Sequence, residues 1–278
     1  MSPPRSPSPP AALPPSLSSV QIPNLPNSAY YIPSFLTSPE ESFLLHKVLS
    51  APQPTWRHLS HRRLQAHPSP LTPQNILLDI AGKGLPDWLR EPVISRLRSI
   101  PVEVATSSDG DIEDATTEGQ HTEDQDNGKR DDIFAPSPHT SPNHVLINEY
   151  HPGQGIHAHE DGDAYFPLVC TVSLGSHTVL DVVRKGVGEP HSGGWRILQE
   201  PRSLLITTGE MYTGCLHGIA GVEVDEGLNE QGIVNWGLLG DRGEYAEGWK
   251  RRGTRISLTY RDVVRVKKVG KAFGGLMR

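Results

Sequence analysis

The second half of the chain reads as a series of short β-strands, and this pattern limits the possible folds more than any other feature. Each run is rich in β-branched residues, and turns containing glycine or proline separate the runs. The runs are HVLINEY (144–150), YFPLVCTVSL (165–174), HTVLDVV (177–183), WRILQE (195–200), SLLITT (203–208) and TRISLTYRDVVRV (254–266). Several short strands after a helical front half predict an α+β fold with a double-stranded β-helix, or jelly-roll, core.

The front half carries the helices that are expected to support this core. An amphipathic helix is predicted to begin with Ser38 as N-cap and Glu41 as its capping-box partner, and to end before Pro52. A second helical region is predicted within 86–100, where leucine and valine side chains recur on one face and Pro92 interrupts the pattern.

Two segments are too polar to contribute to a core. Residues 1–27 are rich in proline and serine, and residues 106–132 contain ten acids, two bases and almost no apolar side chain. Both segments are predicted to be disordered, and a loop insertion is predicted at about 223–250. The chain from 28 to 278 is expected to form one domain.

Composition limits the compartment and the partners. The formal net charge is −6, but residues 106–132 alone carry −8, so the rest of the chain is slightly basic at +2. No run approaches the roughly 18 to 20 apolar residues that a membrane span needs, and the N-terminus lacks the apolar stretch of a secretory signal. Cys170 and Cys215 form neither a disulfide framework nor a zinc motif, so an intracellular protein, nuclear or cytoplasmic, is expected.

The motif HAHEDGD at 157–163 supplies a candidate metal site. In a strand, His159 and Asp161 would point to the same face, because side chains alternate. One further histidine would complete the facial triad that holds non-haem Fe(II) with three positions open. Two solvated side chains in a turn are the alternative interpretation, and His157 is a competing ligand.

Three histidines are candidates for the distal ligand. His177 follows Asp161 too closely to have crossed a barrel, and His191 lies in the loop-like sequence EPHSGG. His217, in CLHGIA, lies where an ordered strand is expected to return, and it is the preferred ligand. The alternative for His217 is a core histidine with a purely structural role.

The sequence TRISLTYR places polar side chains on one face of a predicted strand and apolar side chains on the other. The polar face consists of Arg255, Ser257, Thr259 and Arg261. If this face lines a cavity, its guanidinium groups need anions, and a dicarboxylate such as 2-oxoglutarate meets that need. In HVLINEY, Asn148 and Tyr150 likewise share a face. A polar surface strand is the alternative for either segment.

Together these motifs resemble the AlkB-like dioxygenases. The shared pattern is N-x-Y, then H-x-D, a distal histidine and R-x-S-x-T-x-R. The phrases HVLINEYHPGQGIHAHEDG, SLGSHTVLDV, EPRSLLI and LHGIA are similar to the branch called AlkB homologue six, as is the front half from YYIPSFLTSPEE to LPDWL. The resemblance covers about residues 29–265, apart from the two insertions.

The resemblance implies a role for each matching residue. The Fe(II) ligands would be His159, Asp161 and His217. The residues that bind 2-oxoglutarate would be Asn148, Tyr150, Arg255, Ser257 and Arg261. Of these, Arg255 and Tyr150 would take the distal carboxylate, and Arg261 would lie nearer the metal. In the family, O₂ oxidises 2-oxoglutarate to succinate and CO₂ while a C–H bond of the substrate is hydroxylated, and a hydroxylated N-methyl group leaves as formaldehyde.

AlkB-like enzymes that act on nucleic acid carry an N-terminal lid, and TWRHLSHRRLQ occupies that position here. Trp56 is predicted to stack on a base, and Arg62 and Arg63 are predicted to contact phosphates. The alternative is a basic surface loop with Trp56 packed in the core. The related branch usually continues RRLQ with Trp-Gly-Gly, whereas this chain has Ala66-His67-Pro68, so the lid geometry stays open.

The resulting prediction is a monomeric Fe(II)- and 2-oxoglutarate-dependent dioxygenase that demethylates an N-alkyl group on single-stranded or alkylated nucleic acid. Two alternatives remain. The first is an enzyme of the same family that oxidises protein side chains. The second is a catalytically weak jelly-roll binding module, whose Pro/Ser-rich tail at 1–27 would recruit protein partners.

Overall fold

The computed structural model describes residues 12–80, 82–102, 132–186 and 194–269. The predicted disorder at 106–132 lies outside these residues except for Asp132, which is buried and accepts a hydrogen bond from Arg98 Nε at 2.8 Å. The first eleven residues of the predicted tail also lie outside them. None of the helices in the described ranges is long and apolar enough to cross a membrane.

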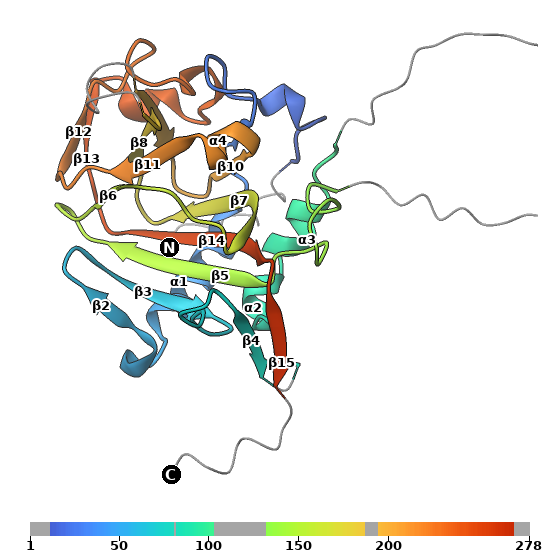
Figure 1. Cartoon of the computed structure of the whole chain (residues 1–278). Coiled ribbons are helices and arrows are strands. Elements are labelled where there is room, and N and C mark those ends of the chain that lie inside the picture. The colour runs from blue at the N-terminus through green and yellow to red at the C-terminus, as the bar shows by residue number, and fades with distance from the viewer. Residues whose placement is uncertain (1–11, 81, 103–131, 187–193, 270–278) are drawn as a thin grey trace, which may run out of the picture.

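Two antiparallel sheets form the core of the protein (Figure 1). The larger sheet contains β1 (Ala29–Ile32), β2 (Arg57–Leu59), β3 (Arg62–His67), β5 (His144–Tyr150), β7 (Tyr165–Leu174), β10 (Leu204–Thr208) and β14 (Arg255–Val263), in the order β1-β10-β7-β14-β5-β3-β2. The smaller sheet contains β6 (Ile156–His159), β8 (Thr178–Arg184), β9 (Trp195–Gln199) and β11 (Cys215–Ile219), in the order β6-β11-β8-β9. Side chains from both sheets line one cavity between them. The predicted jelly-roll core is confirmed.

Helices cover the outer face of the larger sheet. They are α1 (Ser38–Leu49), α2 (Asp87–Arg90) and α3 (Val93–Arg98). Their apolar side chains and the outward side chains of β5, β7, β10 and β14 form one hydrophobic cluster. Pro92 lies between α2 and α3, so it interrupts the second helical region as predicted. The helices and the two sheets therefore make the α+β layering that the sequence predicted.

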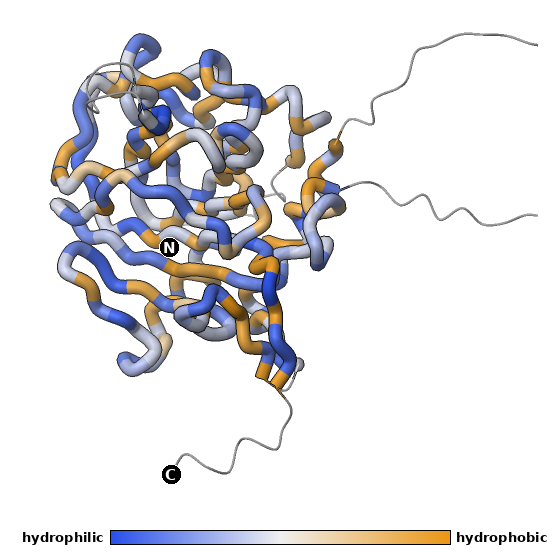
Figure 2. Tube along the Cα trace, in the orientation of Figure 1, coloured by the Kyte–Doolittle hydropathy of each residue, from blue (hydrophilic) through white to orange (hydrophobic). Residues whose placement is uncertain are grey.

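Side chains of β14 alternate between the hydrophobic core under the helices and the cavity between the sheets. Ile256, Leu258 and Tyr260 are buried against the helices. The Tyr260 hydroxyl donates to the Leu89 carbonyl at 3.0 Å, which satisfies its only donor in the apolar layer. The intervening polar residues of β14 face the cavity between the sheets. In Figure 2 hydrophobic and hydrophilic residues are mixed along the strands of the core.

The N-cap of α1 is one residue earlier than predicted. Thr37 caps the helix, and its hydroxyl accepts from the Glu40 backbone while Glu40 completes the capping box. Glu41 instead lies at the buried face of the helix. Its carboxylate accepts from the Gly175 backbone at 2.9 Å and from Arg202 Nη1 at 3.1 Å. The prediction was wrong because two adjacent hydroxyls and two adjacent glutamates fit the same motif, and tertiary contacts choose between them.

The predicted disorder of residues 1–27 is wrong for residues 12–27. Ile22 and Leu25 are buried, and the partly buried Val20 of the 3₁₀ helix η1 (Ser18–Val20) packs against the main core. The Ile22 backbone donates to the Ala29 carbonyl at 2.9 Å, so the segment runs back along β1. A few apolar residues spaced between prolines are sufficient here, because an existing sheet and helix layer receives them.

The predicted loop insertion at 223–250 is a packed layer. It forms β12 (Val224–Glu226), η3 (Trp236–Leu238), η4 (Arg242–Tyr245) and the first two residues of β13 (Trp249–Arg251). Its buried apolar residues, which join the core of the smaller sheet, are Leu228, Ile233, Leu239 and Tyr245. The remaining elements of the fold are η2 (Gln53–Thr55), α4 (Gly209–Thr213) and the parallel pair β4 (Leu77–Ile80) and β15 (Val266–Val269).

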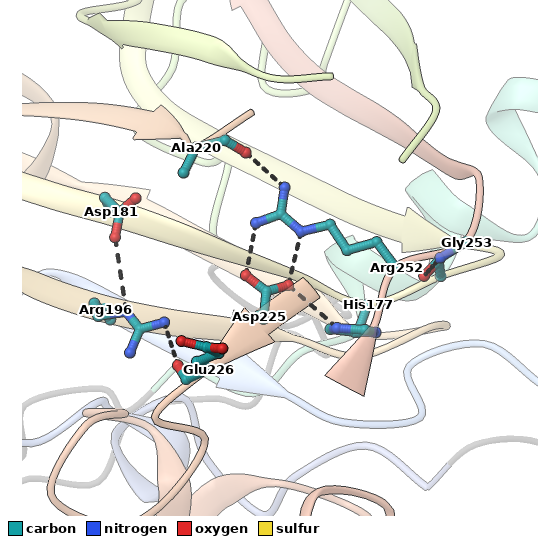
Figure 3. Close-up of polar contacts among 9 residues, drawn as sticks. His177, Asp181, Arg196, Ala220, Asp225, Glu226, Arg252 and Gly253 are labelled. Atoms are coloured by element: carbon teal, nitrogen blue, oxygen red, sulfur yellow. Dashed lines mark hydrogen bonds and ion pairs between the residues drawn. The ribbon is translucent and has the colours of Figure 1, made fainter. Parts of the chain in front are cut away.

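A buried ion pair fastens this layer to the barrel (Figure 3). Arg252 binds Asp225 through two hydrogen bonds of 2.7 Å, from Nε and Nη2, and its Nη1 donates to the Ala220 carbonyl at 2.7 Å. His177 Nε2 lies 3.2 Å from Asp225 Oδ2. Such a two-pronged contact fixes orientation as well as distance, because both planar groups must align. His177 is therefore occupied by a structural contact.

Candidate metal and co-substrate site

Three potential metal ligands meet at the mouth of the cavity. His159 ends β6, and its direct partner across the strand pair is His217 of β11. Asp161 follows two residues after His159. The ligand atoms of these three side chains lie within 4.8 Å of one another, and no other such trio of His, Cys, Asp or Glu forms among the described residues. Two imidazoles and one carboxylate are the donor set of a facial triad, so the residues fit a non-haem Fe(II) ion.

Asp161 reaches this position by a different route from the predicted one. The strand β6 ends at His159, so Asp161 lies in the following loop and strand alternation does not aim its carboxylate. Arg261 does so instead, because its Nη1 lies 2.5 Å from Asp161 Oδ1. The Tyr212 hydroxyl donates to the Gly162 carbonyl and holds the same loop from α4.

The tautomer of His159 follows from its neighbour. Its Nδ1 lies 2.8 Å from the His157 carbonyl oxygen, which can only accept, so Nδ1 carries the proton. The unprotonated Nε2 of a neutral ring is then left for a metal. In His217, desolvation by burial lowers the pKa of the imidazole, with Asp161 acting in the opposite direction and His159 and Arg261 reinforcing the burial. A neutral imidazole is the form that binds a cation.

The other histidines weighed from the sequence lie elsewhere. His177 contacts Asp225, as described above. His157 is exposed, and its ring faces the ring of His61 edge-on with centroids 6.5 Å apart. His191 lies outside the described residues. Of the described candidates, His217 alone joins His159 and Asp161.

A bulge in β6 lets Ile156 and His159, which are three residues apart, both face the cavity. His217 pairs with His159 and Ile219 pairs with Ile156, so three residue steps on β6 oppose two on β11. Gly218 of β11 lies directly against the bulge. A Cβ atom at Gly218 would lie 3.0 Å from Ala158 N and from Ile156 O. The absent side chain therefore permits the close backbone approach that aligns the two histidines.

Substituting Gly218→Ala is expected to weaken both the fold and the metal site. The new methyl group must push β6 away, at a cost of about 1–3 kcal/mol of unfolding free energy, and the His159–His217 spacing changes with it. Denaturant unfolding and anaerobic Fe(II) titration measure the two effects. Gly237→Ala is the matched control because a Cβ there meets nothing within 4 Å. Equal behaviour of the two variants would contradict this account.

The cavity beside the three ligands has a volume of about 120 Å³, and its polar lining comes from neighbouring strands. The β14 side chains in it are Arg255, Ser257, Thr259 and Arg261, and the β5 side chains are Asn148 and Tyr150. The register explains why these two sets meet, since Arg255 lies opposite Tyr150 and Ser257 opposite Asn148. The two faces that the sequence singled out thus form one wall.

Arg255 is a buried cation without an acidic partner. It is 4 % exposed, and its Nη2 donates to Ser173 Oγ at 2.9 Å and Gln199 Oε1 at 3.2 Å. No carboxylate of the described residues lies within ion-pair distance of it, and its Nε has no hydrogen-bond partner. Desolvation lowers the pKa of Arg255 to about 10, against an opposing effect of Tyr150. A buried charge of this kind is costly until an anion pairs with it, so the cavity favours an anionic ligand.

Two other cavity groups can act as donors toward such an anion. Burial raises the pKa of Tyr150, although Arg255 and Arg62 lower it in part, so the phenol keeps its proton. Among the described residues, Nε and Nη2 of Arg261 have no hydrogen-bond partner, and its guanidinium lies 4.1 Å from the centre of the Tyr165 ring. Ser173 and Gln199 were missed from the sequence, where the only signals were the alternating Thr171 and Ser173 of β7 and the single polar residue Gln199 at the end of β9.

The lid residues behave differently from one another. Trp56 is 6 % exposed in the main core, and Arg63 stacks on it with a distance of 4.1 Å to the ring centre. Arg63 also binds Glu149 through hydrogen bonds of 2.6 and 2.8 Å. The predicted stacking of Trp56 on a base is wrong because Trp56 is buried. Arg63 is bound to Glu149 and lines neither the cavity nor the groove, and its contact with phosphate stays a prediction. Arg62 alone reaches the cavity.

An open groove of about 1190 Å³ lies beside His159, the one proposed metal ligand among its lining residues. Its walls are the hairpin turn with His61, the bulge of β6 with His157, and β9 with Trp195 and Arg196. The groove shares lining residues with the cavity at Arg62, Ile156, His159, Val182 and Ile219. A substrate in the groove would thus lie beside His159, while the inner cavity stays available for a second molecule.

The chain is similar to several known proteins. Residues 28–261 match the model of the 2OG-Fe(II) oxygenase superfamily. "Probable RNA/DNA demethylase ALKBH6" of Danio rerio is 34% identical over 259 residues, which cover 90% of this chain and 91% of that protein. "tRNA (carboxymethyluridine(34)-5-O)-methyltransferase ALKBH8" of Mus musculus is 32% identical over 45% of this chain and 18% of that protein. The solved structure described as "The structure of OsALKBH1" aligns with a TM-score of 0.48 at 14% identity, over 86% of this chain and 98% of that one.

Proposed function

This chain belongs to the 2OG-Fe(II) oxygenase superfamily, and we propose that it removes an N-alkyl group from a nucleic acid by oxidation at the triad His159, Asp161 and His217. Its class is an AlkB-like dioxygenase that uses Fe(II), 2-oxoglutarate and O₂. The observation that carries the residue assignment is the meeting of two histidines, one carboxylate and an unpaired buried arginine in one cavity.

We assign metal binding to one end of the cavity and binding of the distal carboxylate of 2-oxoglutarate to the other. At the metal end, His159, Asp161 and His217 would hold Fe(II), and Arg261 orients the carboxylate of Asp161. At the far end, Arg255 would pair with the distal carboxylate of 2-oxoglutarate, with Tyr150 donating a hydrogen bond. When bound, Fe(II) supplies the chemistry that couples oxidation of 2-oxoglutarate to succinate and CO₂ with hydroxylation of a substrate C–H bond.

The remaining polar residues of the cavity would complete the co-substrate site. Ser257 and Asn148 lie opposite each other in the β14–β5 register and both line the cavity. Their hydroxyl and amide groups can donate to carboxylate oxygens. Apolar side chains such as Leu180 and Leu205 line the same cavity and limit the room for water beside the reacting groups.

Nucleic acid is the proposed substrate class. The support is the demethylase named above, which is similar along nearly its whole length, and an open groove whose cationic groups include Arg62 and Arg196. The proposal places the protein in the nucleus, the cytoplasm or both. Cys170 and Cys215, both free and buried, agree with a reducing compartment.

A second candidate is oxidation of a protein side chain, and one observation favours it. Trp56 is packed in the core, so the hairpin offers no tryptophan on which a base could stack.

The test measures succinate formation by anaerobically iron-loaded protein after addition of 2-oxoglutarate and O₂. Methylated single-stranded oligonucleotides, the unmethylated ones and methylated peptides are compared. Stimulation by the methylated oligonucleotide, weakened by salt as phosphate contacts require, is the expected result. Stimulation by the methylated peptide but not by the methylated oligonucleotide would show that the substrate is a protein and not a nucleic acid. Absence of turnover in protein that binds iron and 2-oxoglutarate would favour the catalytically weak binding module.

A further inference from the structure

Arg62 lies at the junction of the cavity and the groove. It belongs to β3 of the lid hairpin, yet it lines the inner cavity together with the groove. Its Nε donates to Asn148 Oδ1 at 3.0 Å, although the two residues are 86 positions apart in the sequence. A side chain of the lid thus touches a side chain of the proposed co-substrate site directly.

This contact fixes which way the Asn148 amide points. A guanidinium nitrogen can only donate, so the atom facing Arg62 must be the amide oxygen. The amide is planar, and its NH₂ group is consequently turned away from Arg62. In the described part of the chain, Asn148 Nδ2 has no hydrogen-bond partner, and Asn148 lines the cavity. The NH₂ group is therefore available to a ligand in the cavity.

Arg62 is not needed to attach the hairpin, because its neighbour does so. Arg63 stacks on Trp56 and binds buried Glu149 through both carboxylate oxygens. Arg62 is only half-buried, and within the described residues its sole hydrogen bond is the one to Asn148. The hydrogen bond of Arg62 therefore acts on the Asn148 amide and not on the attachment of the hairpin. This is what a positioning residue, as opposed to a structural one, would do.

We propose that Arg62 is a positioning residue that holds the Asn148 amide with its NH₂ group toward a carboxylate of 2-oxoglutarate. The inference rests on the proposed function, in which Asn148 binds the co-substrate. Because Arg62 also lines the groove, an occupant that draws Arg62 away releases the amide. The affinities for co-substrate and for groove occupant are then linked, and linkage of this kind is reciprocal.

The experiment measures the Kd of 2-oxoglutarate by anaerobic calorimetry on Fe(II)-loaded protein. Arg62→Met and Asn148→Leu are each expected to raise this Kd by about 10- to 100-fold, as the loss of one hydrogen bond to a charged group does. The double variant should bind no more weakly than Asn148→Leu alone, since the two residues act through one contact. Arg62→Lys keeps a donor that can face Asn148 Oδ1, although without the planar fork, so it should restore part of the affinity that Arg62→Met loses.

The controls separate the possible failures. Arg90→Met alters an exposed arginine of α2 that lines neither the cavity nor the groove, and its Kd should equal that of the unaltered protein. Full affinity in Arg62→Met, or additive effects in the double variant, would overturn the positioning role while leaving Asn148 a ligand. An unchanged Kd in Asn148→Leu would overturn both the inference and the assignment of Asn148. No binding by the unaltered protein would contradict the proposed function itself.

Discussion

Replacing Asp161 with alanine is expected to lower the rate of succinate formation by more than about 100-fold. Loss of a residue that only supports a metal ligand already lowers metal affinity or activity by about 10- to 100-fold, and Asp161 is proposed to be a ligand itself. Two neutral imidazoles remain in Asp161→Ala, and they neither balance the charge of Fe(II) nor complete a facial triad. The measurement is the iron content and the anaerobic Fe(II) affinity of the purified variant, beside its succinate yield.

The matched control is Asp163→Ala, two residues further along. Asp163 is exposed and accepts a hydrogen bond from Asn75 at 3.3 Å, outside the cavity. Its removal should leave iron binding unchanged. Asp161→Asn keeps the shape beside Arg261 without the negative charge, so it separates loss of ligation from loss of folding. Weak iron binding in Asp163→Ala together with normal binding in Asp161→Ala would show that the wrong carboxylate has been assigned.

Regular alternation is the part of the site that the sequence predicted best. Arg255 and Arg261 lie on the cavity face of β14, and Ile256 and Leu258 lie on the helix face, because a strand with period two leaves no other choice once one face is apolar. The N-x-Y motif of β5 follows the same rule. Where an element is regular, residue type and spacing determine its orientation.

Irregular backbone and long-range contacts limited the prediction elsewhere. Asp161 lies past the end of β6 and is oriented by Arg261, which is 100 residues later in the chain. Trp56 resembled a stacking residue in the sequence, yet it is buried in the main core and covered by Arg63, which pairs with Glu149 across β3 and β5. No local pattern contains that information.

Segment 223–250 shows the same limit on a larger scale. Its buried residues are spaced irregularly between glycines, so neither a helical nor a strand periodicity predicts that they are buried. What orders the segment is the core of the smaller sheet together with the Asp225–Arg252 ion pair, which joins positions 27 apart. A sequence that reads as a loop can therefore pack when its partners already exist.

Replacing Arg255 with methionine is expected to change co-substrate binding and stability in opposite directions. Removing one partner of a buried charge pair costs about 2–5 kcal/mol, so the KM for 2-oxoglutarate should rise by about 30-fold or more. Without ligand, however, the same substitution removes a buried cation that has no acidic partner among the described residues. The free energy of unfolding of the ligand-free protein should then stay equal or increase. Succinate kinetics and denaturant unfolding measure the two quantities.

Weaker co-substrate binding together with equal or greater stability distinguishes a binding residue from a structural one. If Arg255 served mainly to hold Ser173 and Gln199 together, Arg255→Met would lower the stability of the ligand-free protein and alter KM only through misfolding. Arg251→Met is the matched control, since Arg251 is exposed and pairs with exposed Glu223 on the surface. It should change neither quantity by a measurable amount. A normal KM in Arg255→Met would contradict the anionic site, because no other cation in the described chain lies opposite Tyr150 in the β14–β5 register.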